Sequence, residues 1–272
     1  MNKSKIRIEG ITLAYGNGRT HKRRWWFGAS ANNRGSNGAP RTVLDGINLE
    51  IETGEFLSIL GHSGCGKSSL LKIIAGFVKP NSGSVLIDDR LVDGPQGDHV
   101  FVFQEGALFP WLTILKNVTL ALKKVENSAE RYEKARHYLE LVSLEAFADY
   151  YPHMLSGGMR QRAEIARALA AQPEVLLVDE PFSGLDYLTR LQMREEILYL
   201  HMMLAKTTIL FVTHDIDEAL QLSNRIIILS DSPGKIQYRH AINIPHPRLL
   251  SSPDLGELRS QIYEQLGVHS AL

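Results

Sequence analysis

The segment Gly61–Ser69, with the sequence GHSGCGKSS, constrains this chain more than any other feature. It follows the apolar run Phe56–Leu60 and precedes Leu70–Ala75, a run of helix-forming residues. A strand, a glycine-rich turn and a helix in this order form the setting of the phosphate-binding pattern G-x-x-x-x-G-K-[ST]. The glycines allow successive N–H groups to point inward, and the positive end of the following helix adds to the anion cradle. We predict that the segment binds a nucleoside triphosphate; the alternative is a glycine turn without a ligand.

Two side chains in this segment have the chemistry that a triphosphate requires. Lys67 supplies a positive charge for the outer phosphates, and the hydroxyl of Ser68 is placed to hold Mg²⁺. The helix end and Lys67 are also expected to favour the thiolate of Cys65, so that a thiol-alkylating reagent would inhibit hydrolysis and bound nucleotide would protect. The predicted nucleotide-binding residues of the segment are Gly61, His62, Ser63, Gly64, Cys65, Gly66, Lys67, Ser68 and Ser69.

The composition is that of an ordinary globular protein. Apolar residues make up 44% of the 272 residues, and 30 Lys and Arg balance 30 Asp and Glu, so no overall field attracts nucleic acid or an acidic membrane. A single cysteine excludes an internal disulfide and suits a reducing compartment. The N-terminal residues lack the apolar core of a signal peptide, and no apolar run approaches the roughly 20 residues that span a bilayer. We expect a cytoplasmic protein whose membrane role depends on a partner.

Strand-like and helical segments alternate along most of the chain, which predicts an α/β fold with a mainly parallel sheet. Strand character is found at residues 5–15, 43–51, 56–60, 84–88, 100–103, 175–178, 209–212 and 226–229. The first two of these runs indicate half-buried antiparallel strands, and Pro233-Gly234 indicates a turn into a closing hairpin. Residues 105–172 are predicted to form a mostly helical subdomain, in which Tyr132, Ala135, Leu139 and Val142 follow the helix period, and 189–204 a further helix. We expect one domain over residues 1–272.

Residues 16–40 interrupt the two N-terminal strands and are rich in Gly, Asn, Ser and Arg. They have no periodicity, which predicts a long loop or disordered insert. The basic and aromatic cluster HKRRWWF within them could contact lipid headgroups or a partner protein. The alternative is a mobile surface segment without a partner.

Polar side chains follow three of the predicted parallel strands, at the edge where ligands bind in such sheets. Asp179 and Glu180 follow the run 175–178, and a carboxylate there can hold Mg²⁺ while a second orients or deprotonates an attacking water. Gln104 could ligate the metal and sense the γ-phosphate. His214 could contact the γ-phosphate or position the water; the alternative is a hydrogen-bonded structural histidine.

A second anion cradle is predicted at Ser156, Gly157 and Gly158, immediately before the helix-forming stretch RAEIARALAA. A helix start of this kind presents unpaired N–H groups and the positive end of the dipole. Because it has neither a lysine nor a nearby metal ligand, it is half of a site, and in a two-fold dimer it could complete the phosphate loop of the other subunit. A helix N-cap without a ligand is the alternative.

The ordered motifs LSGGMRQR, LLVDEPFSGLD and VTHD, together with the phosphate loop, resemble the nucleotide-binding subunit of an ABC transporter over nearly the whole chain. The resemblance implies the ABC ATPase fold of the P-loop NTPases, with an N-terminal antiparallel β subdomain and an inserted helical subdomain. It implies two subunits that sandwich two ATP molecules, with Ser156, Gly157 and Gly158 reaching across. Asp179 would support Mg²⁺, Glu180 would be the catalytic carboxylate, His214 the switch histidine and Asp186 a coupling residue, and Tyr15 would stack on adenine.

Two further stretches, GPQGDHVFVFQEGALFPWLTILKNV and SDSPGKIQYRHAINIPHPR, are similar to importers of nitrate, sulfonates and taurine. This resemblance implies transmembrane permease subunits as partners, an extracytoplasmic solute-binding protein as an indirect one, and a location on the inner face of the membrane. Phe109, Pro110 and Trp111 are proposed to form part of a groove for a cytoplasmic helix of the permease, and core packing of Trp111 is the alternative.

Two other functions remain as alternatives to transport. The first is a soluble ABC ATPase acting on nucleic acid or ribosomes. DNA-repair members of the family carry long coiled-coil insertions, which this sequence lacks, and ribosome-acting members usually contain two cassettes in one chain, whereas this sequence has a single set of motifs. The neutral charge also argues against a nucleic-acid surface. A non-catalytic ATP-binding scaffold is disfavoured because Lys67, Asp179, Glu180 and His214 are all present.

Overall fold

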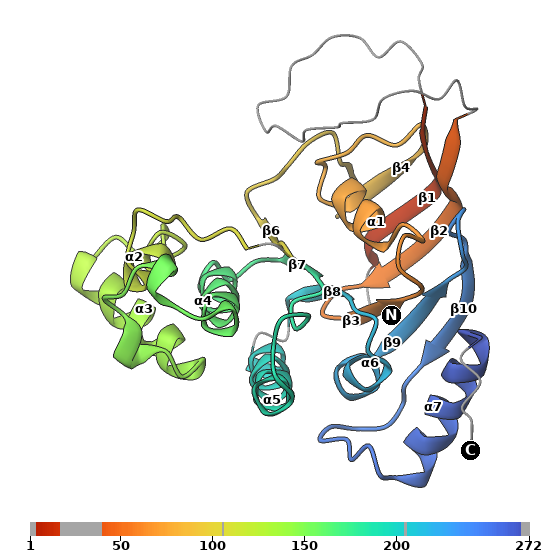
Figure 1. The fold of residues 1–272 in the computed structure, drawn as a ribbon. Coiled ribbons are helices and arrows are strands. Elements are labelled where there is room, and N and C mark those ends of the chain that lie inside the picture. The colour runs from red at the N-terminus through yellow and green to blue at the C-terminus, as the bar shows by residue number, and fades with distance from the viewer. Residues whose placement is uncertain (1–3, 17–39, 105, 204–205, 268–272) are drawn as a thin grey trace.

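Two β-sheets and a helical lobe make up the fold (Figure 1). The structure is a computed structural model and describes residues 4–16, 40–104, 106–203 and 206–267. The predicted insert at residues 16–40 lies outside these residues except for its two ends. The α/β class, the N-terminal antiparallel sheet and the helical subdomain that the sequence predicts are confirmed.

The N-terminal sheet is antiparallel, with the strand order β2-β1-β4-β5. Its strands are β1 (Ser4–Tyr15), β2 (Arg41–Glu52), β4 (Ser82–Ile87) and β5 (Arg90–Leu91). Ile8 pairs with Leu49 and Ile11 with Ile47, and all four side chains are buried on one face of the sheet. The alternation of apolar and polar residues therefore sets which face of this sheet covers the core.

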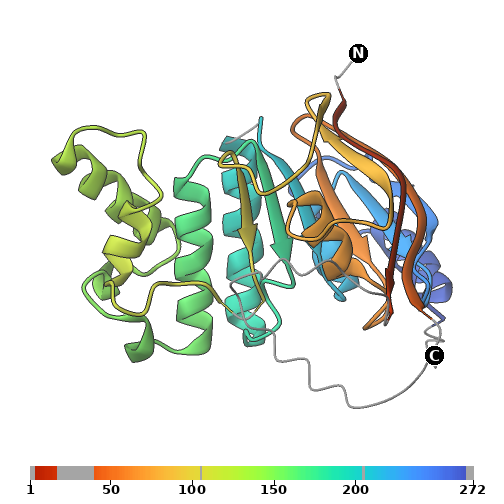
Figure 2. The same cartoon turned by 90° about the horizontal axis from the view of Figure 1, so that it is seen from above.

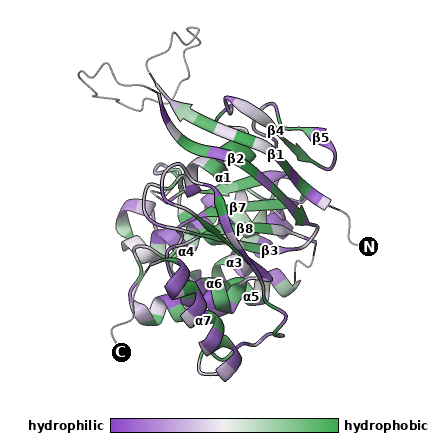
Figure 3. Ribbon diagram, turned by 90° about the vertical axis from the view of Figure 1, so that its right-hand side faces the viewer, coloured by the Kyte–Doolittle hydropathy of each residue, from purple (hydrophilic) through white to green (hydrophobic). Residues whose placement is uncertain are grey.

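The second sheet contains the predicted parallel strands, in the order β10-β9-β3-β8-β7-β6. Its strands are β3 (Phe56–Leu60), β6 (His99–Val102), β7 (Val175–Asp179), β8 (Thr208–Val212), β9 (Arg225–Leu229) and β10 (Ile236–Ala241). The pairings are parallel except for β10, which closes the sheet as an antiparallel hairpin with β9. Strands β3, β7 and β8 are buried along their whole length, as continuous apolar runs in the centre of a parallel sheet require, and β7 and β8 are coloured mainly as hydrophobic in Figure 3.

Helices cover both faces of this second sheet. Helix α1 (Lys67–Ile74) packs between the two sheets, where Leu70, Leu71 and Ile74 join the isoleucines of β1 and β2 in one core (Figures 1 and 2). The opposite face is covered by α4 (Gly157–Ala170), α5 (Tyr187–Met203), α6 (Ile216–Leu222) and α7 (Pro253–Gln265). Helices α6 and α7 lie in parts of the chain where the sequence analysis predicts no helix.

The helical lobe is formed by short helices that pack on α4. It contains α2 (Ile114–Thr119), α3 (Ser128–Leu141), the 3₁₀ turns η1 (Glu145–Phe147) and η2 (Pro152–Met154), and α4 itself. Ala135, Leu139 and Val142 are buried there as predicted, but Tyr132 is exposed. Tyr138, two turns further along α3, is partly buried against this core instead.

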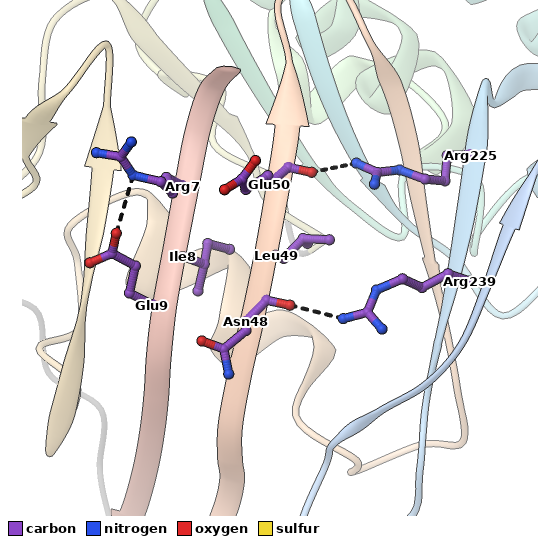
Figure 4. A pocket seen from close by; sticks show the side chains of 8 residues that line it. All are labelled: Arg7, Ile8, Glu9, Asn48, Leu49, Glu50, Arg225 and Arg239. Atoms are coloured by element: carbon purple, nitrogen blue, oxygen red, sulfur yellow. Dashed lines mark hydrogen bonds and ion pairs between the residues drawn. The ribbon is translucent and has the colours of Figure 1, made fainter. Parts of the chain in front are cut away.

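Charged side chains join the two sheets along their outer seam (Figure 4). Arg225 at the start of β9 donates to the carbonyl of Glu50 in β2, and Arg239 in β10 donates to the carbonyl of Asn48 at 3.0 Å. Arg225 also forms an ion pair with Glu55 at 2.7 Å. These contacts fix the antiparallel sheet over α1, and thereby over the phosphate loop.

Candidate active site

The phosphate loop connects the buried strand β3 to the first turn of α1. Gly66 precedes the first helical residue, Lys67, with a φ of 105°, and Gly64 has a φ of 81°. Side chains other than glycine rarely adopt such angles. A Cβ at Gly66 would also lie 2.7 Å from the Cδ2 atom of Leu44 in β2, so this end of the loop packs tightly against the antiparallel sheet. The predicted strand, turn and helix are all present.

Lys67 lies inside this loop. Its side chain is buried, and its ammonium donates to the carbonyl oxygens of Gly61 at 2.7 Å and His62 at 3.1 Å. The nearest carboxylate oxygen, on Glu180, is 4.0 Å away. These hydrogen bonds hold the ammonium against the backbone of the loop, where it can contact an anion bound to the N–H groups.

Ser68 and Asp179 meet between α1 and the end of β7. The Ser68 hydroxyl donates to the Oδ1 atom of Asp179 at 2.8 Å. Burial raises the pKa of the Asp179 carboxyl, and the hydrogen bond from Ser68 opposes this shift. A half-buried hydroxyl and a buried carboxylate thus face each other beside the loop, and the sequence prediction that both serve one metal is compatible with their positions.

Glu180 lies where three neighbouring strands end. Its backbone N–H donates to Val212 in β8 at 3.0 Å, and it adopts a left-handed φ of 45°. One carboxylate oxygen of Glu180 is 3.3 Å from the Nδ1 atom of His214 and accepts from the side-chain amide of Gln104 at 3.5 Å. Because β6, β7 and β8 are adjacent, the residues that follow them come together, as predicted. Within the described chain, Gln104 forms no hydrogen bond with Ser68 or Asp179, so it lies beside the carboxylate rather than beside the expected metal ligands.

The second predicted cradle lies at the N-terminal end of α4 and apart from the phosphate loop. Ser156 caps α4 by accepting the N–H of Met159 at 3.2 Å. Helix α4 packs against β6, whereas the phosphate loop follows β3, and β7 and β8 lie between these strands (Figures 1 and 2). Among the described residues, no hydrogen bond joins 156–158 to 61–69, so the chain does not close this half-site onto its own loop.

Two other predicted residues have clear positions. Tyr15 ends β1 beside Arg41, and 55% of the residue is exposed. Asp186 caps α5: its carboxylate accepts from the N–H of Thr189 at 3.0 Å and from the Thr189 hydroxyl at 2.6 Å. These hydrogen bonds lower the pKa of the Asp186 carboxyl. Whether Tyr15 stacks on adenine and Asp186 couples two sites stays a prediction.

The prediction that Cys65 favours the thiolate form is wrong. Only 2% of the residue is exposed, and burial raises the pKa of its thiol, which outweighs the opposing charge of Lys67. A Cβ at Gly61 would lie 2.8 Å from the Cys65 sulfur, which shows that the side chain points into the packed base of the loop. A buried thiol with a raised pKa reacts slowly, so ready alkylation does not follow.

The comparisons with known proteins agree with this geometry. A family model described as "ABC transporter" matches residues 44–183. The aliphatic sulfonates import ATP-binding protein SsuB of Bacillus cereus is 45% identical over 82% of this chain and 88% of its own length, and an uncharacterised ABC transporter ATP-binding protein of Methanocaldococcus jannaschii is 46% identical over 83% and 85%. A dimeric structure of the ATP-binding cassette MJ0796 in a post-hydrolysis state, bound to ADP and Pi, has a TM-score of 0.72 and 32% identity over 88% of this chain and all of that one.

This chain belongs to the ABC transporter family. It is an ATP-binding cassette with the ABC ATPase fold, and the predicted resemblance is confirmed. No helix in the described part of the cassette is long and apolar enough to cross a membrane.

The sequence predicts the turn at Pro233-Gly234, but not that this turn supports the phosphate loop of the cassette. Gly234, between β9 and β10, donates its N–H to Val43 at 2.8 Å and accepts from Asp45 at 3.1 Å, and a Cβ there would overlap the carbonyl oxygen of Cys65. Asp231 in the same turn is 2.8 Å from the Nδ1 atom of His62. Nothing in the local sequence of residues 231–234 indicates contact with a loop about 170 positions earlier; only the pairing of β9 with β3 brings them together.

We expect Gly234→Ala to weaken ATP binding by the ABC cassette about tenfold, or by about 1 to 2 kcal/mol, because the Cys65 peptide must move and disturb the phosphate-binding N–H groups. The measurement is the dissociation constant of ATP by calorimetry at a temperature where the variant is folded. Gly256→Ala in α7 is the matched control, since its Cβ would meet nothing within 4 Å. Equal affinity in both variants would contradict the prediction.

Proposed function

We propose that this cassette is the ATP-hydrolysing subunit of an importer for a small solute, with aliphatic sulfonates as the first candidate class. The proposal is supported chiefly by the convergence of Lys67, Glu180 and His214 at one edge of the sheet. The candidate solute class comes from the sulfonate-import relative that is 45% identical. The name of one relative does not determine the solute of this chain, so nitrate and taurine stay open.

In the proposed reaction, the phosphate loop and Lys67 bind the triphosphate, and Glu180 acts on the attacking water. The side chain of Glu180 is 20% exposed, so water can reach its carboxylate from solvent, while the contacts with His214 and Gln104 fix the direction of the carboxylate. A carboxylate in this position can orient the water and accept its proton. His214 lies 3.3 Å from the same carboxylate and is exposed, which lets it contact a γ-phosphate beside Glu180.

Mg²⁺ is the expected cofactor, and the residues present fit it. Magnesium is commonly held by one or two protein oxygens together with substrate phosphates and waters. The Ser68 hydroxyl and the Asp179 carboxylate supply these oxygens, 2.8 Å apart, beside the phosphate loop. When bound, the ion would neutralise charge on the β- and γ-phosphates. The position of Gln104 beside Glu180 favours a role in sensing the γ-phosphate over direct metal ligation.

The proposed working unit is a dimer with two ATP molecules at its interface. The separation of Ser156–Gly158 from the phosphate loop of the same chain supports this arrangement, as does the dimeric form of the solved cassettes. ATP would favour the closed dimer because only that form contacts the triphosphate from both chains. Hydrolysis removes this bridge and allows the subunits to separate.

An apolar groove beside Gln104 is the proposed docking site for a cytoplasmic helix of a transmembrane permease. It has a volume of about 1410 Å³. Its aromatic lining is formed by Phe77, Phe101, Phe103, Phe109 and Trp111. Trp111 is 69% exposed, which excludes core packing as its role, and Arg167 lies over the Phe109 ring at 5.5 Å. An exposed aromatic groove of this size fits the apolar face of a helix. Such docking would hold the cassette on the inner face of the membrane.

We expect Trp111→Ser to reduce co-purification of the cassette with its permease about tenfold, because the largest exposed ring in the groove is lost. The matched control is Leu249→Ser, an equally exposed apolar residue that does not line the groove. Thermal unfolding of both variants checks the fold. Undiminished co-purification of the Trp111 variant would place the permease contact elsewhere.

The whole proposal is tested by transport. The cassette is expressed with any permease and solute-binding protein whose genes neighbour its own, and ATP-dependent uptake of ethanesulfonate, nitrate and taurine into membrane vesicles is compared. Uptake of one of them identifies the solute. Stimulation of the ATPase by nucleic acid or ribosomes without any membrane complex would support the soluble alternative instead.

A further inference from the structure

A cluster of charged side chains lies directly behind His214 and is not part of the site described so far. Arg190 and Arg194, one turn apart on α5, both contact the Oδ2 atom of Asp215, at 3.2 and 3.0 Å. Glu218 in α6 is 3.8 Å from Arg190 and 3.6 Å from Arg194. Arg194 and Glu218 are almost completely buried, so these charges depend on one another.

This cluster holds both neighbours of His214. The Oδ1 atom of Asp215 caps α6 by accepting the N–H groups of Asp217 and Glu218, which leaves Oδ2 for the two arginines. The hydroxyl of Thr213 donates to Glu218 and accepts the N–H of Asp215 at 3.0 Å. Because hydrogen bonds fix both Thr213 and Asp215, the backbone of His214 between them has little conformational freedom. The position of this backbone directs the imidazole toward Glu180.

Arg190 also holds a second segment. Its Nη2 atom donates to the carbonyl of Leu185 at 3.3 Å, in the turn that leads from Glu180 to Asp186. The side chain of Leu185 packs on Gly158, where an added Cβ would lie 2.8 Å from its Cδ2 atom. A single guanidinium therefore contacts the residue after His214 and the turn that lies against the Ser156–Gly158 cradle.

We propose that Arg190 is a positioning residue that keeps His214 directed at Glu180 and couples this alignment to the turn 183–186. The inference rests on the proposed function, because it takes His214 and Glu180 as the hydrolytic pair. Arg190 touches neither ATP nor the attacking water. It sets the distance between His214 and Glu180 through Asp215, and it moves with Leu185 when the turn is displaced by a second subunit. Arg194 supports the same carboxylate from the buried side.

The test is the kinetics of Arg190→Gln in the full-length cassette. Arg190 is partly exposed, so glutamine is tolerated sterically, but it loses both the charge at Asp215 and the reach to Leu185. We expect kcat for ATP hydrolysis to fall about tenfold while the dissociation constant of ATP stays within about twofold, since a displaced catalytic group lowers turnover without touching the phosphate loop. Arg190→Lys should regain part of kcat, because an ammonium can pair with Asp215 but cannot reach Leu185 as well.

Arg259→Gln is the matched control. Arg259 on α7 pairs with Asp217 at 2.6 Å and so also contacts α6, whereas the arginines paired with Asp215 in the described residues are Arg190 and Arg194. It should turn over ATP at the rate of the unmodified cassette. If Arg190→Gln does so as well, or if its kcat and ATP affinity fall in parallel, the inference is overturned. If Arg190→Gln does not fold, Arg190→Lys decides: unchanged kcat overturns the inference, and lower kcat at equal ATP affinity supports it.

Glu180→Gln in the same assay separates this inference from the proposed function. Normal turnover by Glu180→Gln would remove the proposed hydrolytic pair and the inference with it. Loss of turnover in Glu180→Gln with full turnover in Arg190→Gln would remove only the role of Arg190.

Discussion

Glu180→Gln is expected to lower the rate of ATP hydrolysis about a thousandfold while ATP still binds, since a positioned general base contributes roughly 10² to 10⁴ to a rate. Glutamine has the same shape but cannot accept the proton of the attacking water. It also removes a negative charge 4.0 Å from the Lys67 ammonium, which favours an anionic ligand there. ATP should therefore bind at least as tightly as before.

The expected result includes a change in oligomeric state. If hydrolysis reopens the dimer, Glu180→Gln with ATP and Mg²⁺ should elute as a dimer, and light scattering during size exclusion would detect it. Phosphate release measures the loss of turnover. Glu195→Gln, an exposed carboxylate on α5, is the control and should behave as the unmodified cassette. A monomer of Glu180→Gln with normal turnover would refute both the role of Glu180 and the shared site.

Lys67→Ala should weaken ATP binding by about 2 kcal/mol, or about thirtyfold, because a hydrogen bond from a charged group to the phosphates is lost. Hydrolysis should fall further, since the same charge stabilises the transferred phosphoryl group. Lys67 is buried and donates to the carbonyls of Gly61 and His62, so its removal also takes one donor from each oxygen, although the His62 carbonyl still accepts the N–H of Cys65 at 3.3 Å.

The dissociation constant of ATP and the rate of phosphate release together test this second prediction. Lys67→Met preserves most of the buried stem and separates the charge from the packing. Lys79→Ala removes an exposed lysine that pairs with Asp93 at 3.2 Å, away from the phosphate loop, and it should change neither quantity. ATP affinity in Lys67→Met equal to that of the unmodified cassette would show that the charge does not hold the phosphates.

The sequence predicted those parts of the site that depend on neighbouring residues. The order of strand, glycines and helix around Lys67 fixes the phosphate loop locally, and the apolar runs before Asp179 and His214 place both residues at strand ends. The alternation in β1 and β2 likewise indicated the antiparallel sheet. Each of these predictions uses backbone conformation or periodicity, which a short stretch of chain specifies by itself.

Other parts were decided only by the tertiary structure. Cys65 was expected to be a thiolate, but its burial under β9 and β2, not the local charge of Lys67, sets the direction of its pKa. Gly234 and Arg190 carried no local pattern that connects them with Cys65 or Asp215. The order β10-β9-β3-β8-β7-β6 brings these distant segments into contact, and burial and ion pairing depend on that order. The residue types and their spacing thus determined the chemistry available to this protein, whereas desolvation and long-range packing determined which groups keep their charge and which hold the others in place.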